Sequence, residues 1–312
     1  MAKPRILFMG TPDFSLPALR LLHEQEYPII GVVTQPDRPK GRGLKEVPPP
    51  VKVMAQSFGL PVFQPEKTGS ESFLNVFKKL DPEMVVLVSF GQILPKTIID
   101  YPPFKCLNIH PSLLPKYRGA APLHWQIIRG ETKTGVSIMI MDEGMDSGDV
   151  LLQVETPLGE EETYGELHDR LAKLGASMLI QSIEEMTQGT AQGIKQDASA
   201  VTFAPLLKKE TGIINWNNKA IDIVNLIRGL SPAPAASALL DGLSLKIFHA
   251  AAKPGAVSDA PGTIAPVNTE GMPVAAADGY VILKDVQLAG KKRMLVPDFL
   301  RGYRLKPGSS FD

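Results

Sequence analysis

Short apolar runs rich in Val and Ile recur along the first half of the chain, and they limit the possible folds more than any other feature. Such runs are typical of strands buried on both faces of a sheet. Between the earlier runs, residues 16–22 and 73–80 carry apolar side chains at helical spacing. This alternation predicts βαβ units, and therefore an α/β domain with a mostly parallel sheet. The runs are RILFMG (5–10), IIGVVTQ (29–35), MVVLVSF (84–90), CLNIHP (106–111), GVSIMIMD (135–142) and VLLQVETP (150–157).

The pattern changes after residue 160. Thr163 and Glu166 have the spacing of a capping box, and apolar residues then recur at helical spacing, so residues 163–187 are predicted to form a long helix. A polar stretch follows Gly189, and a further helical segment covers residues 221–230. Beyond it, short strand-like stretches at 243–250, 262–266 and 271–287 are separated by Gly and Pro. They predict a small antiparallel barrel.

The chain length favours two domains. With 312 residues the chain exceeds the usual size of one hydrophobic core, although a single large α/β domain is the alternative. We place a first domain at residues 1–190, a linker at 191–208 and a second domain at 209–312. Hydrophobic residues make up 44% and charged residues 21% of the chain, which is ordinary for a globular protein.

Cysteine content and the N-terminal sequence bear on the compartment. Cys106 is the only cysteine, so an intrachain disulfide is excluded and a reducing compartment is favoured. The N-terminal apolar run is too short for a secretion signal or a membrane span. We therefore expect a cytoplasmic protein without a membrane partner.

The stretch NIHPSLLPKYRGAAPLHW follows an apolar run and holds the candidate chemistry. Asn108 and His110 lie two residues apart at the end of a predicted strand, so their side chains point to the same side. In open α/β sheets, ligands bind at the carboxyl ends of the strands. A carboxylate from the next strand end could orient the histidine; the candidates there are Asp142, Asp146 and Asp149.

An amide, an imidazole and a carboxylate suit acyl transfer to an amine. The amide N–H can donate to a developing oxyanion, and the histidine can move a proton. The competing interpretation of His110 is a core histidine that hydrogen-bonds to the backbone. Other chemistries have weaker support: a G-x-S-x-G elbow and a G-x-G-x-x-G turn are both missing, and zinc binding by His110, His124 and Asp146 lacks a recognised spacing.

Two stretches are locally basic, although the 33 basic and 33 acidic residues of the chain cancel. Residues 34–50 carry four basic side chains against two acidic ones, and residues 290–312 carry six against two. Each could be an ordinary solvated face or a nucleic-acid contact.

The catalytic stretch together with GMDSGD (residues 144–149) resembles the folate-dependent formyltransferases. Four further motifs, FMGTPDFSLPAL, TQPDRPKGRG, GQILP and AGKKRM, extend the resemblance over the whole chain and to members that act on an aminoacylated tRNA. The resemblance implies a Rossmann-like domain followed by an OB-like β-barrel domain. It also implies 10-formyltetrahydrofolate as formyl donor, methionyl initiator tRNA as acceptor, no metal, and a monomer.

The resemblance also implies roles for particular residues. Asn108 would stabilise the oxyanion, His110 would assist proton transfer, and Asp146 would orient His110 or a water molecule. The folate would lie against the loop of Ser112, Leu113, Leu114 and Pro115, with its pterin near Phe90, Gly91 and Gln92. Phe14 would be a wall of the methionine pocket. The tRNA would meet Arg38, Lys40, Arg42, Lys291 and Lys292, with Arg42 sensing the weak end pair of the initiator.

Two other hypotheses remain open at this point. A related formyltransferase that acts on a small amine, such as a nucleotide or an amino sugar, would share Asn108, His110 and Asp146 but would not need the basic stretches. A noncatalytic RNA-binding module would keep the fold but would not need the three catalytic side chains.

Overall fold

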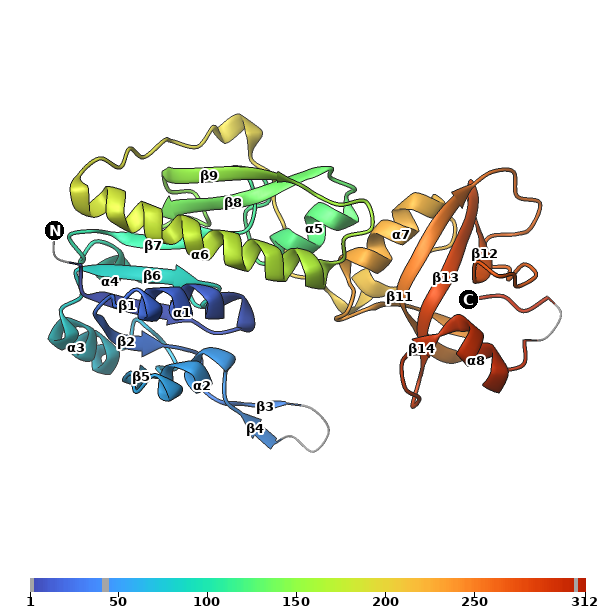
Figure 1. Ribbon diagram of the computed structural model, residues 1–312, viewed down its shortest axis with the longest axis horizontal. Coiled ribbons are helices and arrows are strands. Elements are labelled where there is room, and N and C mark those ends of the chain that lie inside the picture. The colour runs from blue at the N-terminus through green and yellow to red at the C-terminus, as the bar shows by residue number, and fades with distance from the viewer. Residues whose placement is uncertain (1–2, 41–44, 306–307) are drawn as a thin grey trace. The chain divides into compact units, whose positions relative to one another are not determined.

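The computed structural model describes residues 3–40, 45–305 and 308–312. It divides into two compact units (Figure 1). The first comprises Met1–Gly119, Thr134–Thr156 and His168–Phe203, and the second comprises Ala120–Lys133, Pro157–Leu167 and Ala204–Asp312. The boundaries 1–190, 191–208 and 209–312 remain a prediction about independently folding domains. None of the helices in the described ranges has the length and apolarity that crossing a bilayer requires.

A seven-stranded sheet forms the centre of the first unit. β1 is parallel to both β2 and β6, β5 is parallel to β2, and β7 is parallel to β6, whereas β8 is antiparallel to β7. The predicted α/β fold with a mostly parallel sheet is therefore confirmed. The strand order is β5 (Val62–Phe63), β2 (Ile29–Val33), β1 (Ile6–Gly10), β6 (Met84–Val88), β7 (Cys106–His110), β8 (Lys133–Ile140) and β9 (Val150–Pro157).

Helices cover both faces of this sheet. α3 (Glu71–Leu80) and α4 (Lys96–Ile99) pack on the face that carries Leu87 and Cys106. On the other face α6 (Tyr164–Gln188) crosses β7 and β8 (Figure 1), where a Cβ on Gly175 would lie 2.6 Å from Ile109. The predicted capping box opens α6, since the Thr163 N–H donates to Glu166 over 2.9 Å. The remaining helices of this unit are η1 (Asp13–Ser15), α1 (Leu16–Glu24), α2 (Pro50–Ser57) and η2 (Ala198–Ala200).

The strand order reverses between β1 and β6. The chain builds β2 and β5 on one side of β1 and then returns to place β6 and β7 on the other side. The carboxyl ends of β1, β6 and β7 therefore meet at the point where ligands bind in such sheets. Between β2 and α2, the strands β3 (Arg38–Lys40) and β4 (Lys45–Val47) pair as an antiparallel ribbon.

The second unit contains a five-stranded antiparallel sheet that curls into a half-barrel (Figure 1). Its core lies between the sheet and α7, and includes Ile223, Ile227, Leu245 and Val281. The predicted small antiparallel barrel is confirmed, and the structure shows it as an open one. Its elements are α5 (Pro122–Ile128), η3 (Lys209–Gly212), α7 (Ala220–Gly229), β10 (Ala236–Leu240), β11 (Leu243–Pro254), β12 (Met272–Ala276), β13 (Gly279–Leu288), β14 (Met294–Leu295) and α8 (Val296–Gly302).

One predicted strand of this unit takes another form. In residues 262–266, only Thr263 and Ile264 form isolated bridges, to Ser310 and Val274. Gly262 has a φ of 89°, and Pro266 lacks the N–H that a ladder needs. These two residues interrupt the extended backbone on either side of the bridges.

Candidate active site

The end of β7 places Asn108 and His110 on one face of the sheet, as predicted. Cys106 shares this face and is fully buried against α4, where its thiol donates to the Ile98 carbonyl. His110 is 4% exposed, whereas Asn108 is half-buried. The Asn108 amide makes no side-chain hydrogen bond within residues 3–40, 45–305 and 308–312, so its N–H groups are free to bind a ligand.

The contacts of His110 determine which ring nitrogen carries the hydrogen. Nε2 lies 2.9 Å from the carbonyl oxygen of Tyr117. Because a carbonyl can only accept, Nε2 must donate. Nδ1 lies 3.6 Å from Oδ2 of Asp146, which is longer than a hydrogen bond. In the neutral ring, Nδ1 therefore presents its lone pair and can take up a proton, and the Asp146 carboxylate would stabilise the resulting cation.

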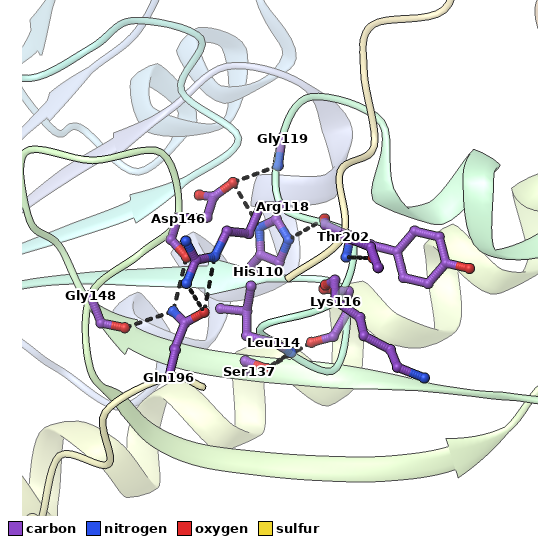
Figure 2. A network of polar contacts seen from close by, with 12 residues as sticks. His110, Leu114, Lys116, Arg118, Gly119, Ser137, Asp146, Gly148, Gln196 and Thr202 are labelled. Atoms are coloured by element: carbon purple, nitrogen blue, oxygen red, sulfur yellow. Dashed lines mark hydrogen bonds and ion pairs between the residues drawn. The ribbon is translucent and has the colours of Figure 1, made fainter. Parts of the chain in front are cut away.

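A polar network holds Asp146 in this position (Figure 2). Its Oδ2 accepts from the Gly119 N–H over 2.8 Å, and its carbonyl oxygen accepts from Gln196 Nε2 over 2.9 Å. Gln196 Nε2 also donates to the Gly148 carbonyl over 2.7 Å. Arg118 Nη2 in turn donates to Gln196 Oε1 over 2.7 Å. Sequence reasoning missed both Arg118 and Gln196. Gln196 lies in the stretch predicted to be a linker, and Arg118 reaches the site only through its hydrogen bonds to Gln196.

Asp146 is the member of the predicted aspartate group that reaches His110. Asp142 instead accepts from Ser147 Oγ over 2.8 Å and from the Gly144 N–H over 3.0 Å. These hydrogen bonds stabilise the loop between β8 and β9. Asp149 lies against Gly193, where an added Cβ would be 3.0 Å from the Asp149 Cβ. The spacing in the sequence could not separate the three carboxylates, but the resemblance selected Asp146.

The loop after β7 is held from beneath by side chains of β8 and β9. Ser137 Oγ donates to the Ser112 carbonyl over 2.7 Å and accepts from the Leu114 N–H over 3.1 Å. Gln153 Nε2 donates to the Leu114 carbonyl over 3.0 Å and to Ser137 Oγ over 2.8 Å. Ser137 and Gln153 together brace the loop across the sheet.

The predicted folate-loop residues differ in how much they present to a ligand. Ser112 is fully buried, and its hydroxyl donates to the Lys116 carbonyl over 2.6 Å. Leu114 is buried against Met139, whereas Leu113 and Pro115 are partly exposed. Contacts to a ligand would therefore come from Leu113, Pro115 and the backbone of the loop.

The segment after β6 supplies an exposed backbone beside this loop. Phe90 is buried, and its carbonyl oxygen accepts from Thr11 Oγ1 over 2.9 Å. Gly91 is exposed and has a φ of 84°, a value that glycine adopts without strain. The Gln92 side chain turns to the neighbouring loop, where Oε1 accepts from the Thr68 N–H over 3.0 Å. The Gln92 amide thus fixes the shape of the segment.

Phe14 lies in η1, directly after β1. Its ring is 4% exposed and meets the His168 ring edge-on, with 5.2 Å between the centroids. His168 thus supports Phe14 from α6. The structure places Phe14 at the carboxyl end of β1 and leaves its contact with methionine a prediction.

The predicted tRNA residues occur in both units. Arg38 lies on β3 and pairs with Glu66 over 3.2 Å, and Lys40 ends the same strand. Lys291 and Lys292 are exposed in the turn after β13, and within the described ranges neither pairs with a carboxylate. Arg42 lies outside the described residues. Arg293 follows the two lysines, but it pairs with Asp285 over 2.6 Å and stacks on Phe248.

The site can carry out acid–base chemistry on a substrate that brings its own nucleophile. Burial raises the pKa of the Cys106 thiol to about 12, so it supplies no thiolate at neutral pH. An amide donor, a histidine with one free ring nitrogen and a carboxylate remain at the strand end. Such a set of groups is suited to acyl transfer between two bound substrates.

The comparisons with known proteins agree with this class of chemistry. Residues 4–183 match the family model "Formyl transferase", and residues 206–304 match "Formyl transferase, C-terminal domain". The chain is 52% identical over 309 residues to the methionyl-tRNA formyltransferase of Syntrophus aciditrophicus, covering 99% of both chains. It is 46% identical over 308 residues to that of Citrifermentans bemidjiense, covering 99% of this chain and 96% of the other. The chain therefore belongs to the formyl transferase family, together with the methionyl-tRNA formyltransferases.

A solved structure supports the fold. HypX from Aquifex aeolicus in complex with tetrahydrofolic acid matches 96% of this chain and 47% of its own, with a TM-score of 0.66 and 17% identity. At this identity the likeness concerns the fold alone.

Proposed function

We propose that the chain transfers the formyl group of 10-formyltetrahydrofolate to the α-amino group of methionyl initiator tRNA, which yields formylmethionyl-tRNA for translation initiation. One observation carries the proposal: a chain that aligns end to end with methionyl-tRNA formyltransferases brings Asn108, His110 and Asp146 together at the carboxyl end of β7. Tetrahydrofolate in the related HypX structure supports a folate donor.

The chemical step follows from the three side chains. The amine lone pair attacks the formyl carbon, and the carbonyl oxygen becomes an oxyanion that accepts from the Asn108 amide. The attacking nitrogen loses a proton to His110 Nδ1, and Asp146 stabilises the imidazolium from 3.6 Å. The bond from the formyl carbon to N10 of the folate then breaks, and N10 takes the proton. The products are the N-formylated aminoacyl-tRNA and tetrahydrofolate.

Different elements of the chain would bind the two substrates. The donor would lie between Leu113, Pro115 and the exposed backbone at Gly91, with the loop already braced by Ser137. The acceptor stem would meet Arg38, Lys40 and Arg42 of the first unit, and Lys291 and Lys292 of the second. Phe14 would form a wall for the methionine side chain. We further propose that the enzyme acts in the cytoplasm as a monomer.

The proposal is tested by following labelled formyl transfer from 10-formyltetrahydrofolate to a panel of acceptors. The panel contains methionyl initiator tRNA, a nucleotide-linked amino sugar and free methionine. Transfer to the tRNA alone supports the proposal. Transfer to the amino sugar in its place would assign a small-amine formyltransferase. Binding of labelled tRNA with no transfer to any acceptor would assign the noncatalytic alternative.

A further inference from the structure

A partly buried polar cluster lies at the base of the β3–β4 ribbon. Lys52 Nζ of α2 lies 2.7 Å from Oδ2 and 2.9 Å from Oδ1 of Asp37, the residue directly before β3. Gln64, the residue directly after β5, donates to Asp37 Oδ1 over 2.7 Å. The Lys52 and Asp37 side chains are 19% and 28% exposed, so solvent screens their pairing only in part.

The same cluster is hydrogen-bonded to the carboxyl ends of two central strands, beside the proposed position of the formyl donor. Gln64 Nε2 also donates to the Gln35 carbonyl over 2.9 Å. Gln35 Nε2 donates to the Phe90 carbonyl over 3.3 Å, and Thr11 Oγ1 donates to the same oxygen over 2.9 Å. The start of β3 is thus tied to the carboxyl ends of β1 and β6.

The neighbouring ion pair is of a different kind. Arg38 and Glu66 pair over 3.2 Å, but their side chains are 64% and 72% exposed. Pairs as exposed as this contribute little to stability, because water and salt screen them. At Asp37, by contrast, the hydrogen bond from Gln64 and the pairing with Lys52 lower the pKa of the carboxyl, so it stays ionised at neutral pH.

We infer that Asp37, Lys52 and Gln64 are positioning residues, which fix the direction in which the β3–β4 ribbon leaves the sheet so that Arg38 at its start is presented to tRNA. The inference rests on the proposed function. A ribbon anchored before binding loses less conformational entropy when it meets its ligand, so anchoring strengthens binding without adding a contact. None of the three side chains needs to touch the RNA or the folate.

Steady-state kinetics test the inference with Lys52→Met, Lys52→Arg and Arg5→Met. Arg5 is the matched control, because it pairs with Asp81 in the same unit but lies before β1, at the opposite end of the strand. Lys52→Met should raise KM for methionyl-tRNA about tenfold. Its kcat and its affinity for tetrahydrofolate should remain within about twofold of the wild-type values. In Lys52→Arg the KM should return close to the wild-type value. Arg5→Met should leave KM, kcat and tetrahydrofolate affinity unchanged.

Limited trypsin digestion gives a second readout that does not depend on activity. Cleavage after Lys45, followed by mass spectrometry, should be several-fold faster in Lys52→Met than in the wild type or Arg5→Met. Unchanged KM and unchanged cleavage in Lys52→Met would overturn the inference. An equal fall of kcat in Lys52→Met and Arg5→Met would overturn it too, because it would show a general stabilising role. If the wild type formylates no tRNA, the proposed function fails, and the digestion still decides whether Lys52 anchors the ribbon.

Discussion

At the scale of single residues, the site depends on which hydrogen-bonding groups are already occupied. The Tyr117 carbonyl occupies Nε2 of His110, and the Gly119 N–H occupies Oδ2 of Asp146. Sequence reasoning could place Asn108 and His110 on one face of a strand, because strand geometry alone decides it. It could not predict that the Tyr117 carbonyl oxygen contacts His110, because this contact depends on a left-handed backbone at Tyr117, where φ is 62°.

The first prediction concerns Asn108. Asn108→Ala should lower the rate of formyl transfer about 10²- to 10³-fold, because an oxyanion donor is lost. Tetrahydrofolate affinity should stay near the wild-type value, since the braced loop is untouched. Single-turnover transfer and calorimetric titration measure the two quantities. A near-normal rate in a folded variant would remove Asn108 from the chemical step.

At the scale of elements, the loop after β7 takes its shape from the two strands beside it. Ser137 lies opposite His110 in the β7–β8 pairing, and its hydroxyl holds two groups of the loop. The sequence shows the two prolines of this loop, Pro111 and Pro115, which restrict its backbone. The brace is not visible, because a serine within an apolar strand gives no sign of which backbone groups it will meet across the sheet.

The second prediction concerns this brace. Ser137→Ala should lower the free energy of unfolding by about 1–3 kcal/mol, because the buried Leu114 N–H loses its partner. It should also weaken tetrahydrofolate binding, since the loop must then be ordered when the ligand binds. Denaturant titration and ligand titration measure the two effects.

Ser177→Ala serves as the control for this variant, because Ser177 is exposed and donates only to the Leu174 carbonyl of its own helix. It should leave folate binding unchanged. Equal effects of the two substitutions would show that the brace has no special relation to the folate loop.

At the scale of the whole molecule, the sequence predicted an α/β sheet followed by a small antiparallel barrel, but not how the chain divides between the two units. The six apolar runs all became strands; β1 and β6 are buried on both faces, whereas β9 at the edge of the sheet is partly exposed. Residues 120–133 and 157–167 group with the second unit through contacts distant in sequence, which local patterns do not encode. The β3–β4 ribbon was likewise missed, since its strands are short and rich in charge and proline.

The third prediction concerns the lysine pair after β13. A plot of the logarithm of tRNA affinity against the logarithm of salt concentration has a negative slope. In the double variant Lys291→Ala, Lys292→Ala this slope should be shallower by about 1.5, because two phosphate contacts are lost. Filter binding over a range of salt concentrations measures the slope. Lys253→Ala is the control, since Lys253 already pairs with Glu270 over 2.9 Å. A slope equal to that of the wild type would show that these two lysines do not meet phosphates.

Formylation of the initiator tRNA is the activity that we expect of this chain. It is tested most directly by the ratio of kcat/KM for methionyl initiator tRNA to kcat/KM for elongator methionyl-tRNA, with 10-formyltetrahydrofolate as donor. Both acceptors carry the same amino acid, so the ratio isolates the recognition of the RNA. We expect a strong preference for the initiator. Equal values for the two tRNAs, or no transfer to either, would contradict it.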